Sequence, residues 1–117
     1  MRRMLIIEDE PDLQMCLQDF FSARGFSVTT AFSGEEALAR LANGPTEIIL
    51  LDIMLPGISG MEVLKRIKAL SPSTKVIMVT GMPQQQFRFQ AEASGAIGYI
   101  TKPFDFSDQT WAQVFAI

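Results

Sequence analysis

The 117-residue chain contains no histidine, which removes a large part of ordinary active-site chemistry. A Ser-His triad and a histidine-ligated zinc site both need an imidazole, so neither can be built from this chain alone. The single cysteine, Cys16, has no disulfide partner within the chain. Its neighbours Leu13, Leu17 and Phe20 predict a small buried residue rather than a nucleophile or a metal ligand. Carboxylates must therefore carry any chemistry.

Long apolar runs and clusters of basic residues are also missing. No apolar segment approaches the length that spans a bilayer, and the first residues lack the pattern of a signal peptide. We therefore expect a cytoplasmic protein without a membrane partner. The net charge is −3, and no basic run exceeds Arg2 and Arg3. This charge balance argues against direct binding of nucleic acid by the domain.

The composition predicts one globular unit. Hydrophobic residues make up 48% of the chain and charged residues 20%, as in an ordinary globular protein rather than a disordered or fibrous one. A chain of this length can bury one substantial core but is short for two independent modules. We expect a single domain over residues 1–117.

Short runs rich in Ile, Val and Leu recur along the chain and predict β-strands. Their hydrophobicity is continuous rather than alternating, which is typical of parallel strands covered by helices on both faces. A more alternating run and a short fifth strand complete the set. The expected strands are 4–7, 26–32, 48–51, 76–79 and 98–101.

Helical patterns separate these strands. The first helix presents an apolar face at three- and four-residue spacings, formed by Leu13, Cys16, Leu17, Phe20 and Phe21, and it ends at Gly25.

The next two helices begin with Ser-x-x-Glu capping boxes, Ser33 with Glu36 and Ser59 with Glu62. A fourth helix is expected over about 83–94, and a fifth from residue 105 or 107 to the end. Alternation of five strands with five helices predicts a doubly wound α/β fold. Right-handed crossovers favour a five-stranded parallel sheet of order 2-1-3-4-5 in a flavodoxin-like three-layer sandwich.

Polar residues follow the strands at the edge where such a sheet binds its ligands. Glu8 and Asp9 follow the first strand and Asp52 the third, while Thr80 and Lys102 follow the fourth and fifth. Three neighbouring acids repel one another unless a cation neutralises them, and an all-oxygen ligand set favours Mg²⁺. Acids at strand ends can instead cap helices or face solvent, but together with a lysine and a hydroxyl they supply what phosphoryl transfer needs.

These residues carry a resemblance over essentially the whole chain. The sequence resembles the receiver domains of two-component response regulators, including the chemotaxis regulators. The matching motifs are Glu8-Asp9-Glu10-Pro11, Asp52-Ile53-Met54-Leu55-Pro56-Gly57 with Gly60, Thr80-Gly81, and Gly98-Tyr99-Ile100-Thr101-Lys102-Pro103-Phe104.

The resemblance implies specific roles. It makes Asp52 the phosphoacceptor, with Lys102 and the Thr80 hydroxyl at the phosphoryl oxygens and Tyr99 as an aromatic switch residue that follows Thr80. It also implies a cis peptide bond between Lys102 and Pro103. The implied ligands of Mg²⁺, or of Mn²⁺ in its place, are Glu8, Asp9, Asp52 and the backbone carbonyl of Met54.

The resemblance also implies a signalling switch rather than an enzyme, active only in its own phosphorylation and slow dephosphorylation. Its phosphodonor would be a histidine kinase or a histidine phosphotransfer protein. Its output surface would comprise the helices at 83–94 and 105–117 with the strand at 98–101, and would contact an effector or a second copy of the chain. Phe89, which does not share the face of Phe87 and Ala91, is expected to be partly exposed there.

Two apolar residues depart from the polar ones common in the family. Met54 and Met82 lie two residues beyond Asp52 and Thr80, where polar side chains often position the attacking water. They suggest a long-lived phosphoryl group, although methionine is also a common filler of gaps in packing.

Two other readings remain open. An aspartate-nucleophile phosphatase shares the sheet and the magnesium-carboxylate site but needs a second Asp where Met54 stands. The second is a receiver-like scaffold that is never phosphorylated. The intact acids, threonine and lysine argue against it, because such a scaffold would not need them. A nucleotide-binding protein is less favoured, because the chain has neither a Gly-x-Gly-x-x-Gly motif after its first strand nor a phosphate-binding loop.

Overall fold

Parallel strands form a single sheet at the centre of the computed structural model, which describes residues 2–44, 46–82 and 85–117. Across these residues the sheet has five strands in the order β2-β1-β3-β4-β5, so the predicted fold class is confirmed. The strands are β1 Arg2–Ile7, β2 Phe26–Ala31, β3 Ile48–Leu51, β4 Lys75–Thr80 and β5 Gly98–Thr101. The predicted strand positions agree to within two residues at each end.

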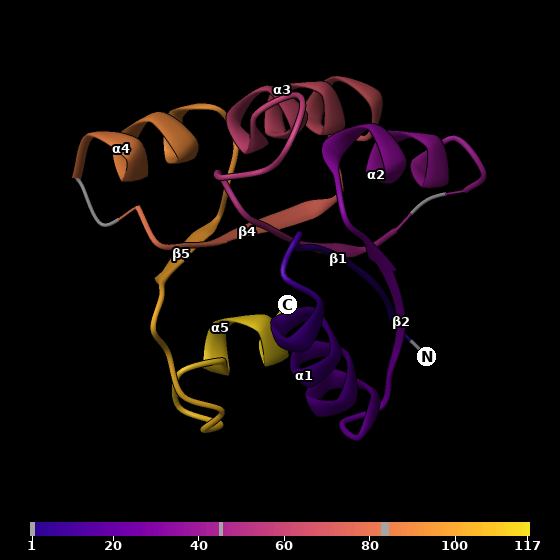
Figure 1. The fold of residues 1–117 in the computed structure, drawn as a ribbon, viewed down its shortest axis with the longest axis vertical. Helices are drawn as coiled ribbons and strands as arrows, with labels where there is room; N and C mark the ends of the chain where they lie inside the picture. The colour runs from indigo at the N-terminus through magenta and orange to yellow at the C-terminus, as the bar shows by residue number, and fades with distance from the viewer. Residues whose placement is uncertain (1, 45, 83–84) are drawn as a thin grey trace.

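Helices cover both faces of the sheet, as Figure 1 shows. Helices α2, α3 and α4 lie on one face, and α1 and α5 lie on the other. Their bounds are α1 Pro11–Ser22, α2 Gly34–Leu41, α3 Gly60–Leu70, α4 Gln85–Ala93 and α5 Ala112–Phe115. None of these helices has the length and apolar composition needed to cross a bilayer.

Two hydrophobic layers fill the space between the sheet and its helices. Within one buried strand, residues alternate between the layers: Leu5 and Ile7 face α2 and α3, whereas Met4 and Ile6 face α1 and α5. This alternation explains why the strand sequences are apolar at every position. The second layer is rich in aromatic rings, with Trp111 completely buried in it.

Both predicted capping boxes begin helices. The Ser33 hydroxyl accepts a hydrogen bond from the Glu36 backbone N–H at the start of α2, and Ser59 does the same for Glu62 at the start of α3. Each serine satisfies a backbone donor that has no partner within the helix. The β3–α3 connection therefore has a defined end at Ser59.

The predicted fifth helix was wrong in its length. Helix α5 contains only Ala112–Phe115, and residues 105–111 form irregular backbone followed by turns instead of helix. The Asp105 carboxylate accepts hydrogen bonds from the hydroxyls of Ser107 and Thr110 at 2.7 and 2.6 Å, and from the Ser107 backbone N–H. Such local bonds offer the backbone an alternative to the helix.

The predicted burial of Cys16 was also wrong, because this thiol is exposed. Leu17 and Phe21 are buried together with Gln14, and this face points away from residue 16. The predicted fourth helix is present as α4, but its expected beginning at residues 83–84 lies outside the described residues. On α4, Ala91 is buried and Phe89 is 63% exposed, as predicted.

Candidate functional site

Acidic residues converge at the carboxyl ends of β1 and β3. One carboxylate oxygen from each of Glu8, Asp9 and Asp52 lies within 4.8 Å of the others. Glu8 and Asp52 are buried, with only 2% and 4% of their surfaces exposed, whereas Asp9 is exposed. Topology explains the convergence, because β1 and β3 are adjacent parallel strands that end at the same edge of the sheet.

Lys102 reaches this cluster from the end of β5, the edge strand of the sheet. Its ammonium Nζ lies 2.7 Å from Glu8 Oε1 and 2.7 Å from Asp52 Oδ2. The peptide bond between Lys102 and Pro103 is cis, as the sequence predicted. One lysine therefore links the end of β5 to the ends of β1 and β3.

Burial, hydrogen bonds and neighbouring charges at the site perturb two pKa values. Burial raises the pKa of Glu8, although hydrogen bonds from Lys102 and from the Glu10 backbone N–H oppose this effect. Burial by itself would lower the pKa of Lys102, but its hydrogen bonds to Asp52 and Glu8 outweigh burial and raise that pKa. Lys102 consequently remains an ammonium beside the acids at neutral pH.

Backbone donors hold the two buried carboxylates in place. The Met54 N–H donates to Asp52 Oδ1 at 3.0 Å, and the Glu10 N–H donates to Glu8 Oε2 at 3.1 Å. Each buried acid thus has one oxygen on the lysine and the other on a backbone amide. This arrangement fixes the orientation of both side chains.

Gln14 is a supporting residue that the sequence did not reveal. It is 6% exposed, and its side-chain amide donates to the backbone carbonyls of Glu8 at 3.0 Å and Ala31 at 2.9 Å. These bonds tie the loop that carries Glu8 and Asp9 to the end of β2. The only signal in the sequence is the position of Gln14 on the face of α1 that also carries Leu17 and Phe21.

Gly60 allows α3 to begin directly against the backbone of the phosphoacceptor candidate. Its N–H donates to the Ile53 carbonyl at 2.9 Å. A Cβ atom at residue 60 would lie only 1.9 Å from the Asp52 carbonyl oxygen and 2.6 Å from the Ile53 Cα. A larger residue would therefore displace the backbone that positions Asp52.

We expect Gly60→Ala to lower the free energy of unfolding by about 2–3 kcal/mol, the upper part of the range for overpacking a filled site. Urea denaturation measures this loss. Gly81→Ala is the matched control, because a Cβ there would meet nothing within 4 Å. Equal stability of the two variants would contradict the close approach at residue 60.

Thr80 and Tyr99 are connected through the backbone of Met82. Thr80 is completely buried at the end of β4, and its hydroxyl accepts a hydrogen bond from the Met82 N–H at 3.4 Å. The half-buried Tyr99 donates its hydroxyl to the Met82 carbonyl. Burial raises the pKa of Tyr99, so it remains a neutral donor. A displacement of Thr80 would therefore be transmitted to Tyr99 through the backbone of Met82.

The donor set suits a hard divalent cation. Three carboxylates against the single ammonium of Lys102 leave two uncompensated negative charges at the sheet edge. Mg²⁺ prefers oxygen ligands and usually keeps several waters, which the exposed position of Asp9 allows. Mn²⁺ accepts the same ligands. The residues therefore fit the predicted metal.

Mg²⁺ affinity is expected to rise with pH above 4.5, the ordinary pKa of glutamate, because the raised pKa of Glu8 lets a proton compete with the cation. A carboxyl with a raised pKa keeps its proton where a free carboxyl has lost it, and only the ionised form binds metal. One displaced proton limits the increase to about tenfold per pH unit. Calorimetric titration with MgCl₂ measures the slope. It should be shallower in Glu8→Gln, and a flat dependence in the parent would contradict the competition.

Residues 4–111 match the family model described as the response regulator receiver domain. The transcriptional regulatory protein DltR of Streptococcus agalactiae is 37% identical over 112 residues, which cover 96% of this chain and 50% of DltR. The response regulator SaeR of Staphylococcus epidermidis is 36% identical over 104 residues, covering 89% of this chain and 45% of SaeR. The chain spans about half the length of these curated relatives.

Solved structures are similar over the whole chain. A CheY-like receiver domain protein from Methanospirillum hungatei superimposes with a TM-score of 0.92 at 29% identity, covering 99% of this chain and 93% of that one. The response regulator TrrA of Thermotoga maritima, solved in complex with Mg(2+)-BeF, has a TM-score of 0.86 and 30% identity, with 100% of both chains covered.

Proposed function

Because the chain belongs to the family of response regulator receiver domains, we propose that Asp52 is its phosphoacceptor and that residues 1–117 act as a single receiver domain. Members of this family are signalling switches rather than classical enzymes. One observation carries the assignment of Asp52: its buried carboxylate contacts the Lys102 ammonium and lies among the acids Glu8 and Asp9. A nucleophile, a cation and a metal-binding group therefore meet at one point.

The proposed reaction transfers a phosphoryl group from a phosphohistidine to Asp52. A carboxylate oxygen of Asp52 attacks phosphorus, the P–O bond forms, and the P–N bond to the imidazole breaks. Lys102 would stabilise the phosphoryl oxygens, together with the Thr80 hydroxyl once Thr80 moves toward them. Mg²⁺ would be held by Glu8, Asp9, Asp52 and the Met54 carbonyl, and supplies charge neutralisation at the transferring group. TrrA, which is 30% identical to this chain, was solved in complex with Mg(2+)-BeF, which supports a magnesium site here.

The switch is proposed to run from Thr80 to Tyr99. Movement of the Thr80 hydroxyl toward a phosphoryl group would break or shift its bond to the Met82 N–H, and the Met82 carbonyl holds the Tyr99 hydroxyl. Phosphorylation would thereby loosen Tyr99 at the surface formed by α4, β5 and α5. The exposed Phe89 on α4 supports this surface as the contact with an effector or a second copy.

The phosphodonor is proposed to be a histidine kinase or a histidine phosphotransfer protein in the cytoplasm. A related CheY of Borrelia burgdorferi was solved with CheX, BeF3 and Mg, which supports contact of such domains with further signalling proteins. The described part of this chain consists of the receiver fold alone, so no direct contact with nucleic acid is proposed for it.

Incubation with a small phosphodonor and Mg²⁺ tests the proposed function. We expect intact-protein mass spectrometry to find one added phosphoryl group, and peptide mapping to locate it on the segment containing Asp52. Omission of Mg²⁺ should suppress the addition. Multiple-turnover release of phosphate from generic phosphate esters would instead favour a hydrolase, and no addition at all would reject phosphoryl acceptance.

The phosphoryl group is expected to persist, because Met54 and Met82 offer no polar side chain to position the attacking water. Met54→Asn and Met82→Glu should each accelerate phosphate release on the order of tenfold. This is less than the rate acceleration of about 10²–10⁴-fold that a fully positioned acid–base group provides. Release of phosphate from loaded, purified protein measures the rate. Rates equal to that of the parent would show that these two positions do not control hydrolysis.

A further inference from the structure

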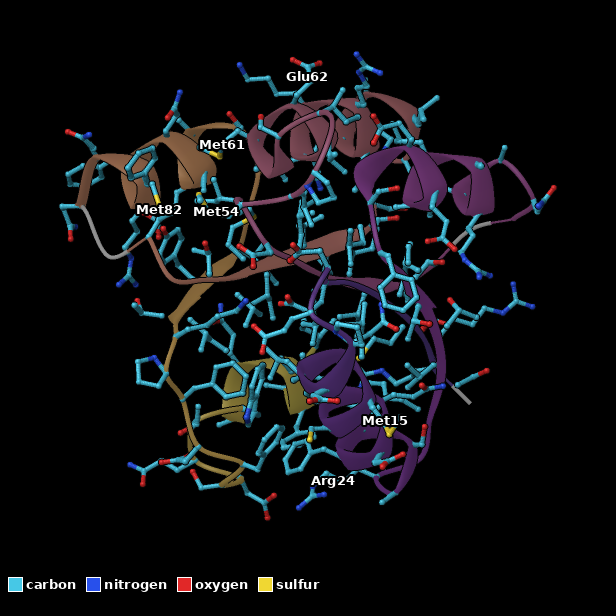
Figure 2. All side chains as sticks on the ribbon, in the orientation of Figure 1. Met15, Arg24, Met54, Met61, Glu62 and Met82 are labelled. Carbon is cyan, nitrogen blue, oxygen red and sulfur yellow. The ribbon has the colours of Figure 1, made fainter. Side chains whose placement is uncertain are left out.

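Two methionines are exposed among the described residues, and only one of them lies beside the acidic site. Met54 is 60% exposed and Met15 is 61% exposed. Met4 and Met78 are completely buried, and Met61 is 9% exposed. Figure 2 shows Met54 on the side of the sheet that carries α2, α3 and α4, whereas Met15 lies on α1 on the opposite side. Met15 is therefore a control for Met54, because it has nearly the same exposure but lies away from the acidic site.

Met54 is hydrogen-bonded to the acidic site through its backbone and lines a hollow that also contains Asp9. Its N–H donates to Asp52 Oδ1 at 3.0 Å. The residue also lines a surface hollow together with Asp9, Ile53, Leu55, Pro56 and Ser59. Solvent entering this hollow therefore reaches Met54 beside Asp9, one of the acids of the proposed metal site.

We propose that Met54 is a peroxide-sensitive modification site whose sulfoxide shortens the lifetime of the phosphoryl group, an inference that rests on the proposed function. One oxygen atom of a peroxide is transferred to the Met54 sulfur, forming the S–O bond as the O–O bond breaks. Sulfur loses two electrons, and the rest of the peroxide takes up the proton and leaves as water or an alcohol. The product is a polar side chain in place of an apolar one, and it is chemically reversible.

The sulfoxide changes the wall of the site because its oxygen accepts hydrogen bonds from water. The thioether is a weak acceptor and leaves that side of the hollow apolar. Water held beside Asp52 is better placed to attack an acyl phosphate. We expect phosphate release to accelerate on the order of threefold, well below the effect of a dedicated acid–base residue because the side chain is flexible and exposed.

The experiment uses the full chain, its Met54→Leu variant and its Met15→Leu variant. Each protein is loaded with a small phosphodonor and Mg²⁺, divided, and treated with hydrogen peroxide or buffer. Peptide mapping then quantifies sulfoxide at every methionine, and phosphate release is timed. Each variant is compared with its own untreated half. Cys16 and Met82 are present in all three proteins, so their oxidation cannot cause a difference among them.

We expect Met54 and Met15 to oxidise at similar rates and much faster than Met4 and Met78. Peroxide should accelerate release from the parent and from Met15→Leu but leave Met54→Leu at its own untreated rate. Oxidation of Met54 as slow as that of Met4, unchanged release from oxidised parent, or acceleration that persists in Met54→Leu would each overturn the inference alone. Failure of the untreated parent to take up a phosphoryl group would overturn the proposed function and this inference with it.

Discussion

Asp52→Ala is expected to lose phosphoryl uptake by at least on the order of 10³-fold, because the variant lacks the nucleophile on which the other groups act. Uptake is measured by intact mass after incubation with a small phosphodonor and Mg²⁺.

The fold of Asp52→Ala should survive, which makes the loss interpretable. Removal of Asp52 relieves repulsion with Glu8 and leaves the Glu8–Lys102 ion pair in place. The fluorescence of Trp111, the single and completely buried tryptophan, monitors folding. Asp19→Ala, which changes an exposed acid of α1, is the matched control and should retain uptake. Uptake by Asp52→Ala at the rate of the parent would assign the phosphoacceptor to another residue.

Lys102→Ala should lower the free energy of unfolding of the metal-free protein by about 3 kcal/mol, the lower end of the range for breaking a buried ion pair. The lower end applies because the lysine side chain is 22% exposed. The loss arises because Glu8 and Asp52 remain buried without their shared cation. Urea denaturation at neutral pH measures it, and phosphoryl uptake should fall as well because the group facing the phosphoryl oxygens is gone.

Mg²⁺ distinguishes this electrostatic cause from a simple loss of packing. A cation bound by the acids should stabilise Lys102→Ala by about 2.7 kcal/mol at a hundredfold excess over its dissociation constant. The same Mg²⁺ concentration should stabilise the parent less, because Lys102 already neutralises Glu8 and Asp52 there. Lys65→Ala, which changes an exposed lysine on α3, is the control and should be nearly neutral in stability. A loss of similar size in Lys65→Ala, or a loss in Lys102→Ala that Mg²⁺ does not reduce, would contradict the role of Lys102 as counterion.

The convergence of the acidic cluster could be predicted because it depends mainly on strand order. Once β1, β3 and β5 are placed in a parallel sheet, residues 8, 52 and 102 must lie at the same edge, whatever the details of side-chain packing. The capping boxes at Ser33 and Ser59 were equally predictable, because they depend on residues only three positions apart.

The features that the sequence could not predict depend on competition between two local structures, a turn or a helix at Asp105 and one buried face of α1 or another. The turn at Asp105 formed because hydroxyls of Ser107 and Thr110 bind its carboxylate, and no helical periodicity reveals that preference. The exposure of Cys16 followed from a rotation of α1 that buries the polar Gln14 in its place. Predicting the buried face of a helix from its apolar residues places a glutamine on the exposed face. Gln14 is nevertheless buried, because two backbone carbonyls accept hydrogen bonds from its amide.

The Gln14 amide has a consequence for chimeric receivers. Both of its acceptors are main-chain carbonyls, those of Glu8 and Ala31, so the clamp does not depend on which side chains β2 carries. A graft that exchanges the whole of β2 for a foreign sequence should therefore keep the acidic loop anchored. Insertion or deletion of a single residue before position 31 would move a different carbonyl into reach and release the loop. Engineering at this edge should be tolerant of substitution and intolerant of changes in length.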